Sequence, residues 1–345
     1  MRRARTIAAL AVIVMLAATL SVYAGGGQDS GEAGAPEPIT MRFGHTLPID
    51  SNHDVYAHRF AEMVAEKSDG RIQITVYPAS QLGAGTQEME ATGMGAIDIG
   101  WGDYSQMEFM EPLCSLTVMP FFFQSFEDLE KIFDGEVGKI LDNSLIEKGN
   151  VRFLAHWWIG GRQMFTKVKL TGLDAAKGIK YRVPESDLYI NTIKTLGMNP
   201  TPVAWPELYT ALQSGLVDAG GSNYDNIVKQ QFYKMCPFVW QSSHIVQVGG
   251  PIINEDLYQS LSPDLQKILV DSAQAVAVDQ RAAYIADEQK LVDFLRKEGV
   301  TVYPLEDFKD LDELTNRYKT GLWVDLVNKV NGQDLFEKML ASVGR

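Results

Sequence analysis

The chain has 345 residues, a length typical of two domains. Hydrophobic residues make up 46% and charged residues 22%, which excludes a disordered chain, a collagen-like repeat and a polytopic membrane protein. There are 31 Lys and Arg against 44 Asp and Glu, for a net charge of −13. Because phosphate binding depends on Lys and Arg, this balance argues against nucleic acids and anionic membrane surfaces as partners.

The first residues have the pattern of a secretory signal peptide. Three arginines open the chain, an apolar stretch follows over residues 7–22, and the sequence VYA at residues 22–24 fits a cleavage site. We therefore expect residues 1–24 to be removed and the mature protein to lie in the periplasm without inserting into the membrane. Residues 25–38 lack apolar periodicity and are expected to form a flexible leader. A transmembrane anchor is the alternative, but the apolar stretch is short of the ~20 residues needed.

Strands and helices are predicted to alternate after residue 38. Period-two and short apolar patterns predict strands at residues 39–45, 72–78, 97–101, 151–157, 178–184 and 216–223. Helical spacing and cap residues predict helices from Ser51 to Gly70, near 87–92 and 126–133, at 187–196, and from Pro206 to Gly215. This βαβ order is typical of an open α/β sheet.

One predicted helix is much longer than the others. No helix breaker occurs between Pro263 and Gly299, and apolar residues keep a helical period throughout. About 35 residues at 1.5 Å each span roughly 50 Å, whereas a domain of about 130 residues is roughly 35 Å across. The helix should therefore cross from one lobe to the other of a two-lobed α/β molecule. A break near Val278 is the alternative.

Motifs of catalysis and of metal binding are missing from the sequence. The five His form no HExxH pattern, there is no GxSxG or P-loop, and Asp98 stands where a dinucleotide fingerprint beginning at Gly93 would need its third glycine. Two Cys cannot make a thiolate zinc site without several His. Cys114 lies in an apolar run typical of a core, and a disulfide with Cys236 is the alternative. We therefore expect a binding protein without metal or cofactor, not an enzyme.

Charged and aromatic residues follow several predicted strands. Arg182 lies near the end of one strand, Arg162 follows another through a two-glycine turn, and Asp103 and Tyr104 come just after a third. Ligands of open α/β sheets bind outside the carboxyl ends of strands, and a guanidinium can hold a carboxylate through two parallel hydrogen bonds. These positions predict a carboxylate site. The alternative is that Arg182 is a surface arginine beside an acidic residue.

Eight segments carry a resemblance to a known family. They are MRFGHT (41–46), YPASQLG (77–83), GAIDIGW (95–101), GGRQMFTK (160–167), KGIKYRVPES (177–186), GMNPTPVAWPELYTALQSGLVDA (197–219), QFYK (231–234) and LSPDLQKIL (261–269). In these segments the chain resembles the DctP-like substrate-binding proteins of tripartite ATP-independent periplasmic (TRAP) transporters. The resemblance implies two α/β lobes joined by a hinge, with lobe I formed by 39–159 plus 249–287 and lobe II by 160–248 plus 288–345.

The resemblance also implies capture of a small organic acid. Arg182 matches the arginine that clamps the carboxylate in this family, and Arg162 matches a second basic position. Asp103 falls where sialate-type members carry a pocket Glu. Trp205 falls where an aromatic side chain packs on the ligand, and His45 falls where a polar residue enters the pocket from the first strand.

One loop departs from the family pattern. After Asp218 the family usually continues Gly-Gln/Ala-Glu-Asn, whereas this chain reads AGGSN over residues 219–223. Ser222 aligns with the pocket Asn and Asn223 comes one place later, so both are candidates for ligand binding.

The resemblance further implies that the loaded protein docks on the small and large membrane subunits of a TRAP permease. Two alternatives from other classes are a periplasmic enzyme acting on an organic acid and a binding protein that serves a sensor.

Overall fold

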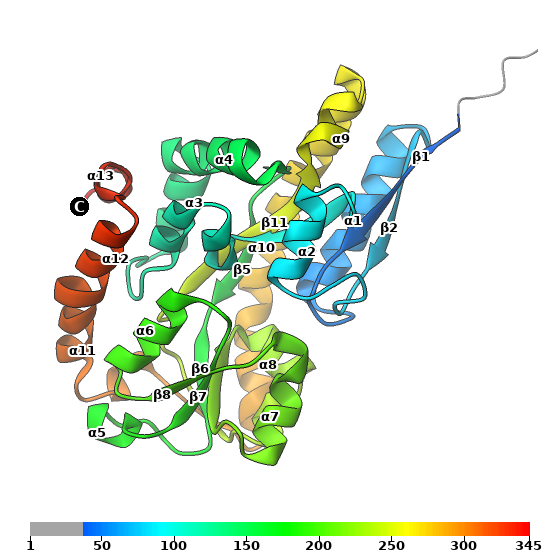
Figure 1. Ribbon diagram of the computed structural model, residues 1–345. Coiled ribbons are helices and arrows are strands. Elements are labelled where there is room, and N and C mark those ends of the chain that lie inside the picture. The colour runs from blue at the N-terminus through cyan, green and yellow to red at the C-terminus, as the bar shows by residue number, and fades with distance from the viewer. Residues whose placement is uncertain (1–36) are drawn as a thin grey trace, which may run out of the picture. The chain divides into compact units, whose positions relative to one another are not determined.

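A computed structural model describes residues 37–345. The predicted signal peptide and nearly all of the predicted leader lie outside the described residues. Two six-stranded sheets with packed helices organise the unit from Pro38 to Arg345 (Figure 1). The expected two-lobed α/β architecture is thereby confirmed, with one lobe built on each sheet.

The first sheet has the strand order β2-β1-β3-β11-β4, and β5 also pairs with β11. Its strands are β1 (Ile39–Gly44), β2 (Ile72–Tyr77), β3 (Ile99–Asp103), β4 (Val151–Phe153), β5 (Trp157–Gly161) and β11 (Val246–Asn254). Strand β1 is parallel to β2 and β3, whereas β11 is antiparallel to its three partners. The accompanying helices are α1 (Asn52–Lys67), α2 (Thr86–Gly93), η1 (Tyr104–Phe109), η2 (Pro112–Val118), α3 (Phe126–Phe133), α4 (Glu136–Gly149) and α9 (Glu255–Ser260).

The second sheet has the strand order β12-β10-β6-β9-β7-β8. Its strands are β6 (Gln163–Thr166), β7 (Lys180–Val183), β8 (Asn199–Pro202), β9 (Ala219–Ser222), β10 (Phe238–Trp240) and β12 (Thr301–Tyr303). Strand β7 is parallel to both β8 and β9, so the carboxyl ends of these three strands lie at the same edge. The accompanying helices are α5 (Leu173–Ala176), α6 (Asp187–Thr195), η3 (Trp205–Glu207), α7 (Leu208–Ser214), α8 (Tyr224–Lys229), η4 (Phe232–Lys234) and η5 (Leu305–Asp307).

The chain passes between the two lobes several times. Arg162 alone separates β5 of the first sheet from β6 of the second, and residues 241–245 lead back from β10 to β11. Helix α10 (Pro263–Lys297) then runs for 35 residues without a break. It contacts α1 and β5 of the first lobe and α8 and β12 of the second. The predicted helix spanning both lobes is therefore confirmed, and the break considered near Val278 does not occur.

The last part of the chain is helical, which the sequence patterns did not predict. Its elements are α11 (Leu311–Arg317), the short π-helical segment η6 (Tyr318–Leu322), α12 (Trp323–Lys329) and α13 (Gln333–Ser342). Segment η6 packs on α6, α12 packs on η2, and α13 packs on α3 and α4. The C-terminal segment thus reaches from helices of the second lobe to helices of the first.

The predicted strand over residues 151–157 is wrong in extent, because the structure has two short strands there. Both β4 and β5 pair with the long strand β11, which carries Gly250 and Pro251 between the two pairings. Pro251 has no N–H to donate, and Gly250 has a φ of 151°. The ladder is therefore interrupted, and the Leu154 N–H donates to the Pro251 carbonyl across the gap at 2.9 Å.

Both cysteines are buried and free. Cys114 lies in the hydrophobic cluster around η2 and α4, and Cys236 lies in a different cluster around α7 and α8. The disulfide considered as an alternative therefore does not form in this structure. Between residues 37 and 345, no helix is both long and apolar enough to cross a membrane. Within the same residues, no three His, Cys, Asp or Glu side chains gather as a metal site would require.

Candidate functional site

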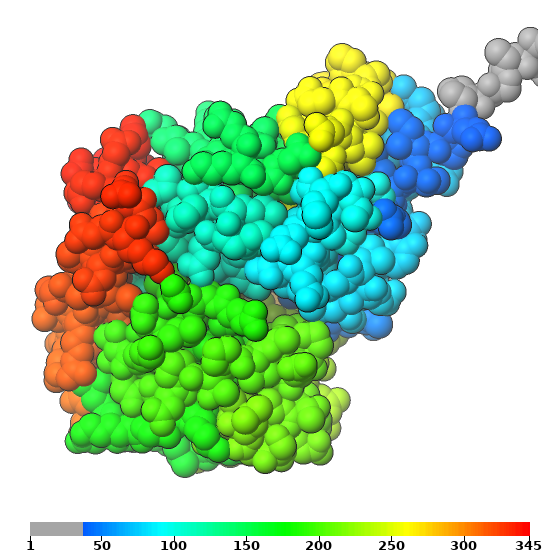
Figure 2. Space-filling view, in the orientation of Figure 1, coloured from blue at the N-terminus to red at the C-terminus, as the bar shows by residue number. Residues whose placement is uncertain are grey.

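A cavity of about 230 Å³ lies between the two lobes. The first lobe contributes residues after β1, the start of α2 and the end of β3. The second lobe contributes residues after β7, β8 and β9, at the edge where these parallel strands end. In Figure 2 the cyan surface of the first lobe meets the green surface of the second along a narrow seam. The cavity therefore lies where an open α/β sheet is expected to bind its ligand.

Arg182 is a buried cation without an acidic partner. Its side chain comes from β7, and the residue is only 3% exposed. The Nε donates to the Val203 carbonyl at 2.9 Å, and the guanidinium lies 5.5 Å from the ring centre of Trp205. Within residues 37–345, Nη1 and Nη2 make no hydrogen bond and Arg182 forms no ion pair. Burial and the nearby Arg162 lower the pKa of Arg182 to about 9. The guanidinium is therefore still charged at neutral pH, and the alternative of a surface arginine beside an acid is excluded.

Arg162 connects the two sheets. Its Nη1 donates to Gln247 Oε1 of β11 at 2.9 Å, and its Nη2 donates to the Gly221 carbonyl of β9. The guanidinium also lies 5.1 Å from the ring centre of Tyr189. A side chain at position 221 would clash with the Tyr181 hydroxyl, which explains why glycine suits this close approach. Unlike Arg182, Arg162 already has acceptors for both terminal nitrogens.

Asp103 ends β3 and faces three donors. It accepts from the Ser105 N–H at 2.9 Å, from Gln106 Nε2 at 3.1 Å and from Gln247 Nε2 at 3.0 Å. The pKa of Asp103 is raised, because burial outweighs the lowering effects of the hydrogen bonds from Ser105 and Gln106 and of the Arg162 charge. Because all three contacts come from N–H groups, they stabilise the ionised carboxylate.

Five of the eight predicted site residues line this cavity: Arg182, Arg162, Asp103, Trp205 and Ser222. Among the lining residues that were not predicted are three buried polar ones, Gln247, Tyr189 and Asn226. Tyr189 and Asn226 lie in the first turns of α6 and α8, the helices that follow β7 and β9. Their positions after strand ends were a usable signal. Gln247 is one of two polar residues of β11, the other being Asn254, and only its hydrogen-bond partners show its place in the site.

His45 and Asn223 do not line the cavity. His45 is fully buried, and its Nε2 contacts Asp54 Oδ1 at 3.1 Å. Asn223 caps α8 by accepting from the Asn226 N–H at 2.8 Å, and its Nδ2 donates to the Ile159 carbonyl at 2.6 Å. Both polar ends of Asn223 are therefore occupied by structural hydrogen bonds.

Tyr104 also lies away from the cavity. Its hydroxyl donates to Asp142 and lies 2.9 Å from His156 Nε2, and its ring stacks on Phe153 with centres 4.6 Å apart. Tyr104 follows Asp103 directly, and successive side chains of an extended chain point to opposite sides. When Asp103 faces the cavity, Tyr104 is therefore directed into the core of the first lobe.

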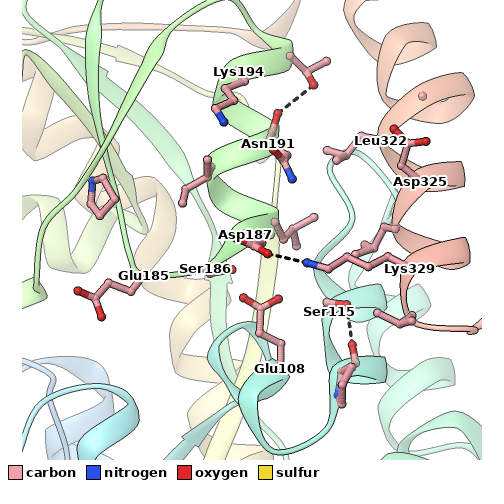
Figure 3. A pocket seen from close by; sticks show the side chains of 18 of the residues that line it. Glu108, Ser115, Glu185, Ser186, Asp187, Asn191, Lys194, Leu322, Asp325 and Lys329 are labelled. Carbon is pink, nitrogen blue, oxygen red and sulfur yellow. Dashed lines mark hydrogen bonds and ion pairs between the residues drawn. The ribbon is translucent and has the colours of Figure 1, made fainter.

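A larger hollow of about 910 Å³ lies between α6 and α12, beside η1 and η2. Figure 3 shows Asp187 of α6 paired with Lys329 of α12 across this hollow. Three other carboxylates line it without an ion pair among the described residues, Glu108, Glu185 and Asp325, against one unpaired base, Lys194. This excess of acid disfavours an anion, so the smaller cavity with the two arginines is the candidate carboxylate site.

Comparisons with known proteins agree on one family. Residues 43–318 match the family described as bacterial extracellular solute-binding protein, family 7. The sialic acid-binding periplasmic protein SiaP of Vibrio cholerae is 27% identical over 304 residues, covering 87% of this chain and 95% of that protein. The 2,3-diketo-L-gulonate-binding periplasmic protein YiaO of Escherichia coli is 30% identical over 300 residues, covering 86% and 90%.

Solved structures of other periplasmic binding proteins have the same fold. The sugar acid binding protein DctPAm of Advenella mimigardefordensis, solved in complex with galactonate, is 25% identical with a TM-score of 0.83, covering 89% of this chain and 98% of that one. A TRAP periplasmic solute-binding protein of Chromohalobacter salexigens has a TM-score of 0.82 at 24% identity, covering 88% and 98%. The two-lobed fold and the matched family together establish that this chain belongs to family 7 of the bacterial extracellular solute-binding proteins, the DctP-like substrate-binding proteins of TRAP transporters.

Proposed function

We propose that this protein captures a small organic acid in the 230 Å³ cavity, with Arg182 holding the carboxylate. The observation that carries this proposal is the guanidinium of Arg182, which is buried, charged and without an acidic partner among residues 37–345. Burial of a cation costs much free energy unless an anion compensates it, and a carboxylate can accept from both terminal nitrogens at once. Relatives named for sialic acid, diketogulonate and galactonate binding support a carboxylate ligand.

We further propose that the protein is exported to the periplasm and delivers its ligand to the small and large membrane subunits of a TRAP permease. Family membership supports both the location and the partner. In this role the protein binds and releases its ligand without changing it, and needs no cofactor.

A thermal-shift screen against a library of organic acids tests the proposed ligand class. A ligand present at 100 times its Kd should stabilise the folded state by about 2.7 kcal/mol, because it binds the folded chain alone. We expect at least one carboxylate to give such a stabilisation, and its uncharged amide to give none. A library in which only neutral compounds stabilise the protein would contradict the proposal.

We also propose that the lobes open and close around the two strand connections, at Arg162 and at residues 241–245. In this structure the lobes touch through the Asn52 N–H of α1, which donates to Asp225 Oδ2 of α8 at 2.9 Å. Ligand contacts made by both lobes should favour the closed state.

Small-angle scattering measures this closure. The radius of gyration should fall when the best acid from the thermal-shift screen saturates the protein, because the ligand bridges the lobes. Asp225→Ala removes the acceptor of the contact between α1 and α8, so the unliganded variant should have a radius at least as large as the wild type. A radius that stays the same at proven saturation would exclude a hinge motion.

A further inference from the structure

The geometry points to selection of organic acids that carry a single negative charge, with Asp103 as the residue that excludes dicarboxylates. This inference rests on the proposed function, in which Arg182 holds one carboxylate. It concerns the part of the ligand other than that carboxylate. Among the described residues, the cavity offers no second free cation to this part.

The charge of Arg162 is already matched inside the protein. Gln247 accepts from Arg162 Nη1 at 2.9 Å through its Oε1 and donates to Asp103 Oδ2 at 3.0 Å through its Nε2. The amide thus connects the guanidinium to the carboxylate in one chain of hydrogen bonds. All three residues are at least nine-tenths buried, so water screens this pair of charges little.

Four charged residues line the cavity: Arg162, Arg182, Asp103 and Glu185. Glu185 is exposed at the rim, where it also borders the larger hollow (Figure 3). With Arg162 and Asp103 paired through Gln247, only the charge of Arg182 is left to compensate. One carboxylate on the ligand does so completely, whereas a second would be in excess in a cavity that the carboxylates of Asp103 and Glu185 also line.

The remaining polar groups of the cavity are neutral. Asn226 Oδ1 and the Tyr189 hydroxyl are both buried without a hydrogen-bond partner within the described residues, and both residues line the cavity. An amide oxygen accepts hydrogen bonds only, so it suits a hydroxyl and repels a carboxylate. The part of the ligand beyond its carboxylate is therefore expected to be neutral and hydroxylated.

The test compares acids that differ only in the second charge. Binding is measured by calorimetry for three pairs in which a terminal CH₂OH is replaced by a carboxylate: galactonate and galactarate, gluconate and glucarate, and 4-hydroxybutyrate and succinate. A like charge forced against a buried carboxylate is strongly unfavourable, so each dicarboxylate should bind about 100-fold more weakly than its partner, or not detectably.

The variant Asp103→Asn tests whether Asp103 is the residue that discriminates against dicarboxylates. The amide keeps the size of the side chain and removes its charge, so Asp103 no longer balances the positive charge of Arg162, which can then attract a second carboxylate. The ratio of affinities within a pair should shift toward the dicarboxylate by about 10-fold or more. Asp98→Asn is the matched control, because Asp98 precedes β3 at its other end, pairs with Arg42 and lies outside the cavity. It removes the same charge and should leave the ratio unchanged.

The outcomes separate this inference from the proposed function. A dicarboxylate that binds as tightly as its partner, with binding lost in Arg182→Ala, overturns the inference and keeps the proposed function. If none of the six acids binds, the acid found in the thermal-shift screen decides, since a monoanion supports the inference and a dianion overturns it. Failure of every carboxylate in both experiments overturns the proposed function itself. The wild-type comparison needs no variant, so it holds even if Asp103→Asn does not fold.

Discussion

Arg182→Ala is expected to weaken binding of the acid by about 30-fold to several thousand-fold. Removing one partner of a buried, hydrogen-bonded charge pair costs about 2–5 kcal/mol, and each 1.4 kcal/mol is tenfold in affinity. The full range applies here because Arg182 is 3% exposed and is the only cation lining the cavity that hydrogen bonds in the described chain do not connect to an acidic residue. Calorimetry with the acid found in the screen measures the loss.

Two further variants make this result specific. Arg182→Lys keeps the positive charge but loses the planar pair of donors, so it should recover only part of the affinity. Arg42→Ala removes a half-exposed arginine of β1 that pairs with Asp98 outside the cavity, and it should bind like the wild type. If Arg182→Ala folds by circular dichroism and binds within about threefold of the wild type, Arg182 is not the clamp. Arg162 would then be the leading candidate.

Glu88→Gln is expected to raise the free energy of unfolding by about 4 kcal/mol more at pH 8.5 than at pH 5. Glu88 is buried in α2, its Oε1 accepts from the Trp101 N–H at 2.8 Å, and its Oε2 has no partner in the described chain. Burial raises its pKa from 4.5 to about 8, against the effect of the Trp101 hydrogen bond.

The direction of this pH effect depends on when Glu88 loses its proton in the folded and in the unfolded chain. Between pH 4.5 and 8 the unfolded chain releases the Glu88 proton and the folded chain keeps it, so rising pH destabilises the wild type through this group. Glutamine cannot ionise and still accepts from Trp101, so this loss should disappear. Urea unfolding at pH 5 and pH 8.5 measures it, with Glu90→Gln, an exposed position of the same helix, as control. A Glu88→Gln variant no better at pH 8.5 than at pH 5 would show that Glu88 is ionised in the folded protein without cost.

Local patterns in the sequence were sufficient for most individual elements. Ser51 was predicted to begin a helix, and in the structure its side chain accepts from the Asp54 N–H at the start of α1. The unbroken run from Pro263 to Lys297 formed one helix, because each turn of a helix depends on residues three or four positions away. The C-terminal helices were missed, since α12 and α13 take their stability from packing on η2, α3 and α4 rather than from caps or long periodic runs.

The candidate site also has some features that the sequence predicts and others that only the folded structure shows. Arg182 could be placed at a strand end from sequence, because proline two residues later ends the strand. Only the folded structure shows that Arg182 has no acidic partner in the described chain. It also shows that Gln247 connects Arg162 to Asp103. These three residues lie in β3, β11 and the connection between β5 and β6, as much as 144 positions apart. Local patterns along the chain are enough to place Arg182, Arg162 and Asp103 at strand ends. Which of them face one another depends on how the strands pair and on which side each chain turns, and no local pattern contains that information.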